Sequence, residues 1–356
     1  MGLSGMNEAS ARDKARMLLL QHGWNTTCWQ ILNPGIQLWF SRAGDAVVGF
    51  VETRTHCVVA GAPVCAEERL AAVLAEWESA ARKRVCYFGA EGRLQSILNL
   101  NPNYAPVSLG AQPLWSPGDW TKAVEQDSSL RYQLNRARNK GVSVEEWPPA
   151  MVHGHPELRA CLDSWLATRG LPAMHFLVEP DTLGHPEDRR FFVAVRNGSV
   201  VAFVTMSPIP KRRAWLTEQF PRIVGAPNGS VELALDAAVR AVGDDGAEMV
   251  TMGIVPLSAH GESSSLHNPP WLRLISRWAK AHGRRFYNFE GLDRFKTKFH
   301  PTEWEPIRVI SHEPQFSLST LYAVGEAFAG EAPWKPLFKA IKSAGRKELE
   351  SLKILR

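Results

Sequence analysis

Helix-like and strand-like segments alternate along this chain, first over residues 9–109 and again over residues 158–289. The segment 66–83 has the i, i+3, i+4, i+7 spacing of one apolar helix face, formed by Leu70, Val73, Leu74 and Trp77. Alternation of this kind is typical of α/β proteins, and we expect mixed sheets. Because the two halves have similar length and order, we also expect a duplicated fold.

The individual elements follow from hydrophobic periodicity and turn residues. We expect helices over 9–22, 66–83, 92–99, 128–141, 158–168, 231–242 and 271–281. The expected strands are shorter apolar runs at 28–32, 38–41, 46–53, 57–59, 85–88, 104–109, 191–196, 200–207, 214–218, 248–252 and 285–289. Residues 191–207 predict a hairpin, because Asn197-Gly198 is a favoured two-residue turn.

A length of 356 residues suggests two domains. We place an N-terminal domain at 1–127, a basic linking helix and strand at 128–150, a C-terminal domain at 151–312 and a basic amphipathic helical tail at 313–356. Between residues 335 and 356 the tail carries seven cations and two acids. A helix of this kind lies on an anionic membrane surface, binds nucleic acid or docks on its own domain, and the sequence leaves all three open.

Three cations occupy every second position of one C-terminal segment: Arg294, Lys296 and Lys298. Residues 285–289 before them predict a strand, and Gly291 predicts a turn. We therefore expect a cationic loop at a strand end, which can hold a polyanion or a developing negative charge. The alternative is a solvated turn whose cations only confer solubility.

The predicted helix 128–141 is a second cationic segment. It contains four cations and no acid: Arg131, Arg136, Arg138 and Lys140. At about 100° per residue, Leu130, Leu134 and Ala137 share one apolar face. A basic helix beside a domain junction predicts a track for nucleic-acid phosphates, and the alternative is a helix whose charged side only meets water.

Several functional classes have no support in the sequence. The N-terminal residues show no signal-peptide core, and no apolar run approaches the roughly 20 residues of a membrane span. Five cysteines form no CxxC pair, so we expect buried free thiols and a cytoplasmic location. His153 and His155 lack a third ligand, so we expect no metal site. The chain has neither a P-loop nor a GxSxG elbow.

Five segments together resemble the C-terminal catalytic domain of bacterial phosphatidylglycerol lysyltransferases, the multiple peptide resistance factor family. They are residues 34–39, 129–141, 225–233, 250–258 and 286–299, the last followed by Trp304-Glu305-Pro306. The resemblance runs from Trp24 to Val309. It implies two GNAT-like acyltransferase domains in tandem, with a basic helix near their junction. It also implies transfer of an aminoacyl group from charged tRNA to a lipid hydroxyl. Charged tRNA is then a co-substrate, and no cofactor is expected.

The resemblance gives individual residues candidate roles in catalysis. Glu232 stands where the family motif has an acid, so it is a candidate for binding the amino group of the aminoacyl moiety or for acting as general base. An acid here is also favoured simply by the helix dipole. Lys296, Lys298 and Arg294 are candidates for holding the terminal phosphate of tRNA or the ester oxyanion. Asp293 either orients Lys296 or caps a turn.

Further residues are candidates for substrate binding. The four cations of the basic helix would follow the tRNA backbone: Arg131, Arg136, Arg138 and Lys140. Glu218 and Arg222 stand near a family Asp and Arg that precede the Pro-Asn-Gly turn, so both are candidate substrate ligands. His260 could assist proton transfer or be an ordinary loop histidine.

The chain departs from the family pattern in two respects. Family members carry a multi-span membrane domain, which is not seen in this sequence, so we expect an acceptor that is either a lipid or a small molecule and need not be phosphatidylglycerol. Ile307 separates Pro306 from Arg308, whereas the family places Arg directly after Pro. We expect aminoacyl-tRNA and no DNA as partner, and a cytoplasmic enzyme for which peripheral contact with an anionic membrane at its inner face is an option.

Two other function classes remain open. An acyl-CoA-dependent GNAT acyltransferase needs an R/Q-x-x-G-x-G/A loop for the pyrophosphate, and residues 138–143 and 240–245 both fail this pattern at its last position. A non-catalytic module that binds RNA or an anionic membrane would use the same basic segments. Label transfer from charged tRNA, coenzyme A binding, and tRNA binding without turnover distinguish the three.

Overall fold

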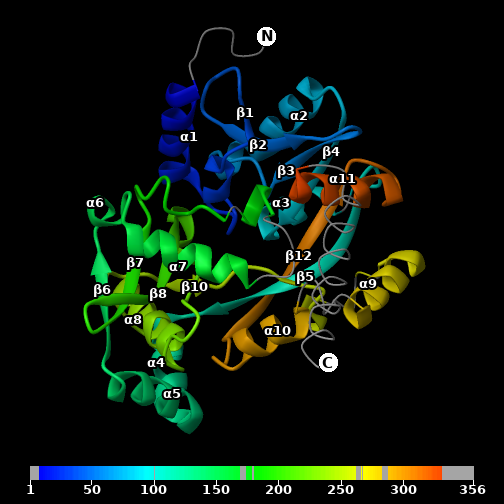
Figure 1. The fold of residues 1–356 in the computed structure, drawn as a ribbon. Helices are drawn as coiled ribbons and strands as arrows, with labels where there is room; N and C mark the ends of the chain where they lie inside the picture. Colours follow the sequence, from blue (N-terminus) through cyan, green and yellow to red (C-terminus); the bar gives the residue numbers. More distant parts are fainter. Residues whose placement is uncertain are drawn as a thin grey trace, which may run out of the picture.

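The computed structural model describes residues 8–330 apart from 100, 169–173, 179, 262–265, 267 and 283–287 (Figure 1). Its described part is organised around one twelve-stranded sheet with the order β1-β2-β3-β4-β12-β5-β10-β9-β8-β7-β6, in which β11 also pairs with β5. The strands are β1 (Gln37–Phe40), β2 (Val47–Glu52), β3 (His56–Ala60), β4 (Arg84–Ala90), β5 (Ala105–Trp115), β6 (Val142–Trp147), β7 (Arg190–Arg196), β8 (Ser199–Ile209), β9 (Ala214–Gln219), β10 (Met249–Thr251), β11 (Val255–Pro256) and β12 (Glu303–Ser311).

The helices connect and cover these strands. They are α1 (Glu8–His22), α2 (Leu70–Ala80), α3 (Gly92–Leu98), α4 (Pro117–Gln126), α5 (Ser128–Asn139), α6 (Pro149–Val152), α7 (Pro156–Ala167), α8 (Ser230–Asp244), α9 (Pro270–His282), α10 (Phe289–Thr297) and α11 (Leu318–Ala329). Short 3-10 turns are η1 (Trp29–Leu32), η2 (Glu67–Arg69), η3 (Phe176–Val178), η4 (Pro210–Arg212) and η5 (Ala259–Gly261). None of the helices within the described ranges is long and apolar enough to span a bilayer.

The predicted α/β class with mixed sheets is confirmed. Strands β3 and β4 pair in parallel, as do β9 and β10, while the other neighbours are antiparallel. The predicted hairpin is β7–β8, where Asn197 (φ 51°) and Gly198 (φ 80°) adopt the left-handed conformation that a tight two-residue turn requires.

One predicted strand is wrong, and a second is contradicted only at its last residue. The run 28–32 forms the 3-10 turn η1, because its residues are buried all round and a short apolar run does not distinguish strand from helix. The predicted strand 285–289 lies largely outside the described residues, and Phe289 instead begins helix α10. The side chain of Asn288 caps that helix by accepting a hydrogen bond from the Gly291 amide at 2.9 Å. The cationic segment is therefore helical and not a loop.

Strand β12 joins the two halves of the chain. It pairs antiparallel with β4 on one side and β5 on the other, and β5 in turn pairs with β10. A strand from the predicted domain 151–312 thus lies between two strands of the predicted domain 1–127. The three domain boundaries stay a prediction. Of the tail 313–356, helix α11 is described, and the basic residues 335–356 lie outside the described part.

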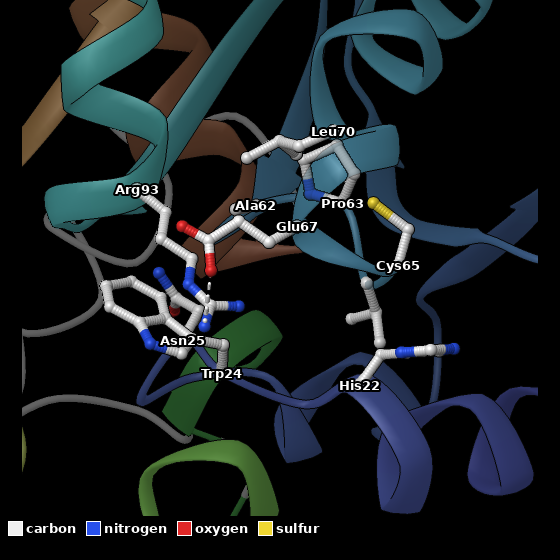
Figure 2. A pocket seen from close by; sticks show the side chains of 10 residues that line it. His22, Trp24, Asn25, Ala62, Pro63, Cys65, Glu67, Leu70 and Arg93 are labelled. Atoms are coloured by element: carbon white, nitrogen blue, oxygen red, sulfur yellow. Dashed lines mark ion pairs between the residues drawn. The ribbon is translucent and has the colours of Figure 1, made fainter.

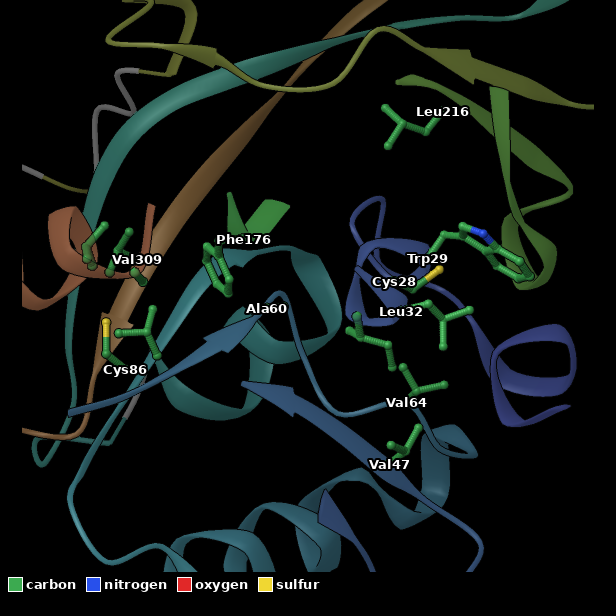
Figure 3. Packing of buried hydrophobic residues seen from close by; sticks show 14 of the residues in the cluster. Cys28, Trp29, Leu32, Val47, Ala60, Val64, Cys86, Phe176, Leu216 and Val309 are labelled. Atoms are coloured by element: carbon green, nitrogen blue, oxygen red, sulfur yellow. The ribbon is translucent and has the colours of Figure 1, made fainter. Parts of the chain in front are cut away.

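The sheet buries a separate apolar cluster on each face of its β9–β10 region. Leu216 and Met249 belong to the cluster formed with α1 and η1, and Figure 3 shows η1 lying between Leu216 and Val47. Trp215 and Val250 point to the other face and pack in the cluster covered by α4, α5 and α8. Successive strand residues alternate between faces, so this division locates the polar side chains of β9 as well.

Candidate active site

Lys298 brings together three elements that are distant in sequence. Its Nζ lies 2.5 Å from Oε1 of Glu232, in the first turn of α8, and 3.4 Å from Oε1 of Gln133 on α5. The Lys298 side chain is 26% exposed and that of Glu232 is 15% exposed. An ion pair with this accessibility can be reached by a substrate while remaining partly shielded from water.

The close approach of α8 to α5 depends on Gly229. This residue precedes α8 with a φ of 94°, and a Cβ built on it would lie 2.1 Å from the Gln133 carbonyl oxygen. Only glycine combines that backbone conformation with that contact. The Pro227-Asn228-Gly229 turn therefore sets the start of α8, and with it Glu232, against the basic helix.

Aromatic packing fixes the position of Lys298. Its ammonium lies 4.4 Å from the ring centroid of Phe295 and 5.0 Å from that of Phe299, so the cation interacts with both ring faces. Phe299 is itself buried, stacks on Trp120 with centroids 4.7 Å apart, and accepts a hydrogen bond at its carbonyl from Trp115 Nε1 at 2.8 Å. These contacts hold the end of α10 against the sheet and the helices beside it.

A second contact ties the same segment to the basic helix. His300 Nε2 lies 2.8 Å from Oδ2 of Asp127, the residue whose Oδ1 caps α5 by accepting from the amides of Ser129 and Leu130. The hydrogen bond with His300, followed by those from the α5 amides, holds the pKa of Asp127 below its ordinary value. The cationic segment and the basic helix, expected to act together, are thus in direct contact.

The structure corrects the expectation that Lys296 lies outside the core. Its side chain is buried, and its Nζ donates to the backbone carbonyls of Met252 (2.6 Å), Gly253 (2.9 Å) and Ile254 (3.2 Å). Burial lowers the pKa of Lys296 to about 7, with the charge of Asp293 acting in the opposite direction. Alternate residues share a face in an extended loop but lie about 200° apart on a helix, so Lys296 points inward and Lys298 outward.

The other two candidates on α10 lie near this pair. Asp293, one turn before Lys296, has a buried Oδ1 without a hydrogen-bond partner among the described residues. It interacts with Lys296 through its charge. Arg294 is exposed in the last turn of the helix.

Helix α5 has the predicted apolar face, since Leu130, Leu134 and Ala137 are buried. Its cations lie on the other sides. Arg131 donates to the carbonyl of Glu125, and Arg138 bonds Asn135 at 3.2 Å and lies 3.8 Å from Asp236 of α8. Arg136 is half-buried, and Lys140 is exposed at the end of the helix. Arg138 therefore links the basic helix to α8.

Glu218 is not brought to the Lys298 pair, whereas Arg222 lies two residues after Phe220, which stacks on Phe295 beside Lys298. Glu218 lies on β9 at a register shift with β8, where Thr205 pairs with Gln219 and Met206 pairs with Thr217. There it forms a buried two-pronged ion pair with Arg189, with N–O distances of 2.6 and 3.2 Å. Arg222 is exposed just after the strand. His260 stacks on Trp304 with ring centroids 4.1 Å apart.

Among the described residues, no group of three or more His, Cys, Asp or Glu side chains is arranged to hold a metal ion. The family profile for phosphatidylglycerol lysyltransferase, C-terminal, matches residues 16–309, most of the chain.

The chain belongs to the phosphatidylglycerol lysyltransferase C-terminal family.

Solved structures agree with the family in fold. The chain is similar to the C-terminal domain of a putative lysylphosphatidylglycerol synthetase from Agrobacterium fabrum, with a TM-score of 0.74 and 21% identity over 91% of this chain and 98% of that one. It is also similar to L-PGS from Bacillus licheniformis, with a TM-score of 0.71 and 20% identity over 94% and 96% of the two chains.

A more distant similarity is to FemX, with a TM-score of 0.55 and 10% identity over 88% and 98% of the two chains. A search of curated proteins found no match. Together the family and the fold make this chain a transferase of the acyltransferase type, built on the GNAT-like fold that the resemblance implies.

This member of the lysyltransferase family also contains a buried carboxylate cluster that sequence reasoning missed. One guanidinium nitrogen of Arg212 lies 3.0 Å from Glu91 and 3.0 Å from Glu305. Gln112 Nε2 donates to Glu305 at 2.9 Å, while its Oε1 is buried without a partner among the described residues. Burial, and next the charge of Glu305, raise the pKa of Glu91 to about 8. Glu305 lies in the Trp304-Glu305-Pro306 motif, which was the available signal.

A shallow pocket lies close to this cluster (Figure 2). Its lining includes Trp24, and Arg93 pairs there with Glu67 at 3.0 Å. The guanidinium of Arg93 lies 4.7 Å from the Trp24 ring centroid, and that of Arg212 lies 5.2 Å from it. The Trp24 ring therefore connects the pocket wall to the buried carboxylates.

Proposed function

We propose that this chain transfers an aminoacyl group from charged tRNA to a hydroxyl or amine of a lipid or small-molecule acceptor. Membership of the lysyltransferase family supports the reaction class. The observation that carries the proposal is the position of Lys298, in contact with Glu232 on α8 and with Gln133 on the basic helix α5. A catalytic acid–base pair and a surface for RNA phosphates are thereby adjacent.

The chemistry needs no covalent enzyme intermediate, because the aminoacyl ester is already activated. The acceptor oxygen or nitrogen attacks the carbonyl carbon of the ester, and the bond from that carbon to the terminal ribose oxygen of tRNA breaks. Glu232 accepts the proton that the acceptor loses, which is a role for general base catalysis. The Lys298 ammonium stabilises the developing oxyanion, and Glu232 passes the proton it accepted to the leaving ribose oxygen.

Helix α5 supplies the electrostatic part of tRNA binding in this proposal. Its four cations have no acid between them in the helix sequence, Arg131 and Arg138 are exposed, and Arg138 lies 3.8 Å from Asp236 of α8. Phosphate contacts of this kind contribute affinity that depends on salt and not on base sequence. Residues outside α5 would then recognise the amino acid. Charged tRNA serves as co-substrate, with no added cofactor.

The decisive experiment is label transfer. Purified protein is incubated with tRNA carrying a radioactive amino acid and with a lipid extract, and the organic and aqueous phases are analysed. We expect ribonuclease-sensitive label in an acceptor. Testing the amino acids charged onto total tRNA one at a time identifies the amino acid that is transferred. Mass spectrometry identifies the acceptor.

The same assay separates the alternatives. Tight coenzyme A binding with acyl transfer and no transfer from tRNA would instead make this an acyl-CoA enzyme. Saturable tRNA binding without turnover on any lipid or small-molecule pool would make it a non-catalytic binding module. Either result overturns the proposal.

A further inference from the structure

Helix α9 has an apolar surface that faces away from the core. Leu274 is 64% exposed, Ile275 38% and Trp278 61%. The buried Leu272 lies on the side of α9 that meets the protein, and Trp271 in the first turn packs against the cluster containing α1. Exposed large apolar residues scattered singly are ordinary, whereas three within five residues form a contiguous strip that marks an interaction surface.

The remaining exposed part of α9 is cationic. Arg273, Arg277 and Lys280 are all exposed, and the helix sequence Pro270–His282 contains no acid. At about 100° per residue the three cations fall within about 60° of one another. They adjoin the side that carries Leu274 and Trp278. A helix with an apolar strip beside a row of cations is the pattern of helices that lie in the interface of an anionic bilayer.

The start of α9 is attached to the rest of the protein. The side chain of Asn268, just before α9, accepts from the Ser108 amide at 2.8 Å and donates to the Ser108 carbonyl at 2.7 Å on β5. Trp271 stacks on Phe316 with centroids 6.3 Å apart. These contacts attach the start of α9 to β5 and to the segment of Phe316. In Figure 1 α9 lies at the right of the molecule and the basic helix α5 at the lower left.

The geometry points to α9 as the surface that docks this chain on an anionic phospholipid membrane. Leu274, Ile275 and Trp278 enter the headgroup region, while Arg273, Arg277 and Lys280 meet the lipid phosphates. The inference rests on the proposed function in that a lipid acceptor would be presented at such a membrane. Helix α5 has the charge but carries one large exposed apolar residue, Tyr132, so it fits a polyanion better than a bilayer.

The test is co-sedimentation of the full chain with vesicles, in the absence of tRNA. Vesicles of phosphatidylcholine alone are compared with vesicles that also contain phosphatidylserine, an anionic lipid chosen because it need not be the acceptor. We expect binding to the anionic vesicles only. Arg273→Gln with Arg277→Gln should weaken binding by about fivefold for each cation removed. Leu274→Ser with Trp278→Ser should weaken it by about tenfold or more.

The matched control is Met17→Ser with Val224→Ser, which removes two residues that are 69% and 76% exposed on other elements. This control should bind vesicles as the wild type does. A second readout uses Leu274→Cys labelled with an environment-sensitive fluorophore. The five native cysteines are buried, so the label is selective. Its emission should shift to the blue when anionic vesicles are added.

Unchanged vesicle binding in the α9 variants would overturn the inference. So would a wild-type dimer in solution that the α9 substitutions dissociate, because the strip would then pair with a second copy of the chain. Failure of the proposed function looks different, since α9-dependent vesicle binding without transfer from tRNA would remove the proposed reaction and leave the docking surface. Transfer from tRNA to a water-soluble acceptor without vesicle binding would support the proposed reaction and remove the docking surface.

Discussion

The ammonium of Lys298 and the carboxylate of Glu232 are 2.5 Å apart, although 66 positions separate the two residues in the sequence. Lys298 ends α10 and Glu232 begins α8, so each lies at a helix terminus and both border the basic helix α5. Two oppositely charged groups at helix ends can exchange protons with a ligand without the rearrangement of a packed core. This relationship is the basis of the first prediction.

Replacing either member of the pair should abolish turnover and leave the fold intact. For Lys298→Ala and Glu232→Gln we expect the rate of label transfer from charged tRNA to fall by about 10²–10⁴-fold, the usual effect of losing a general base or an oxyanion donor. The melting temperature should change little, because both side chains are partly exposed. Lys122→Ala, which removes a 71% exposed lysine from α4, is the control and should keep full activity.

Replacing Lys296, unlike replacing Lys298, should lower the stability of the fold. Lys296→Met removes the donor to three buried carbonyls, and we expect a loss of about 1–3 kcal/mol in the free energy of unfolding. Lys298→Met is the matched control, because that lysine lies at the surface of the same segment. Urea unfolding followed by circular dichroism measures both, and equal stability of the two variants would contradict the assigned contacts.

The pH dependence of Lys296 has a definite sign. Its pKa is lowered from 10.5 to about 7 in the folded chain, so between these values the unfolded chain binds more protons than the folded one. The contribution of this group to stability therefore rises with pH in that window, by at most about 1.4 kcal/mol per pH unit. Lys296→Met should lack this rise when unfolding is measured at about pH 7 and about pH 9.

The two cationic segments show what a sequence can and cannot predict here. The apolar face of α5 was predictable, because Leu130, Leu134 and Ala137 recur with helical spacing and the structure buries all three. The segment of Lys296 and Lys298 was predicted as a loop. Periodicity alone cannot choose between an extended and a helical backbone over so few residues, and that choice decides which lysine is buried.

Long-range contacts limited the prediction further. Glu91 and Arg212 are 121 positions apart and Arg212 and Glu305 are 93 apart, so no local pattern links them. Glu218 was a candidate from its place before the Pro-Asn-Gly turn, but its orientation depends on the strand β9 and on Arg189 from another loop. The family resemblance identified the correct class of protein, whereas the partners of each charged group followed only from the fold.

Gly229 should be intolerant of substitution. Gly229→Ala puts a Cβ 2.1 Å from the Gln133 carbonyl oxygen at a φ of 94°, and we expect a loss of about 2–4 kcal/mol with displacement of α8 from α5. Gly225→Ala is a close control, since Gly225 has a φ of 86° and nothing within 4 Å of its Cβ position. It should lose about 1 kcal/mol from backbone strain alone. Chemical denaturation of the two variants gives the comparison, and similar losses would argue against the helix contact.

The basic helix should determine how salt affects tRNA binding. For Arg136→Gln with Arg138→Gln we expect weaker binding and a log–log salt dependence that is flatter by about one to two units, because fewer counterions are released. Arg42→Gln with Lys122→Gln, which removes two exposed cations from elsewhere, should leave the slope unchanged. Filter binding of labelled tRNA over a range of salt concentrations measures the slope. An unaltered slope in the α5 variant would mean that the phosphates are bound elsewhere.

Glu91 should make the chain less stable as pH rises. Its pKa is raised from 4.5 to about 8 in the folded state, so between these values the folded chain holds a proton that the unfolded chain has lost. The contribution of this group to stability is therefore highest below about pH 4.5 and falls as pH rises towards 8, by at most about 1.4 kcal/mol per pH unit. Glu91→Gln keeps the hydrogen-bonding shape without the ionisation. Between about pH 5 and about pH 8 the unfolding free energy of the wild type should fall relative to that of the variant. A constant difference between the two would show that Glu91 is ionised beside Arg212 throughout.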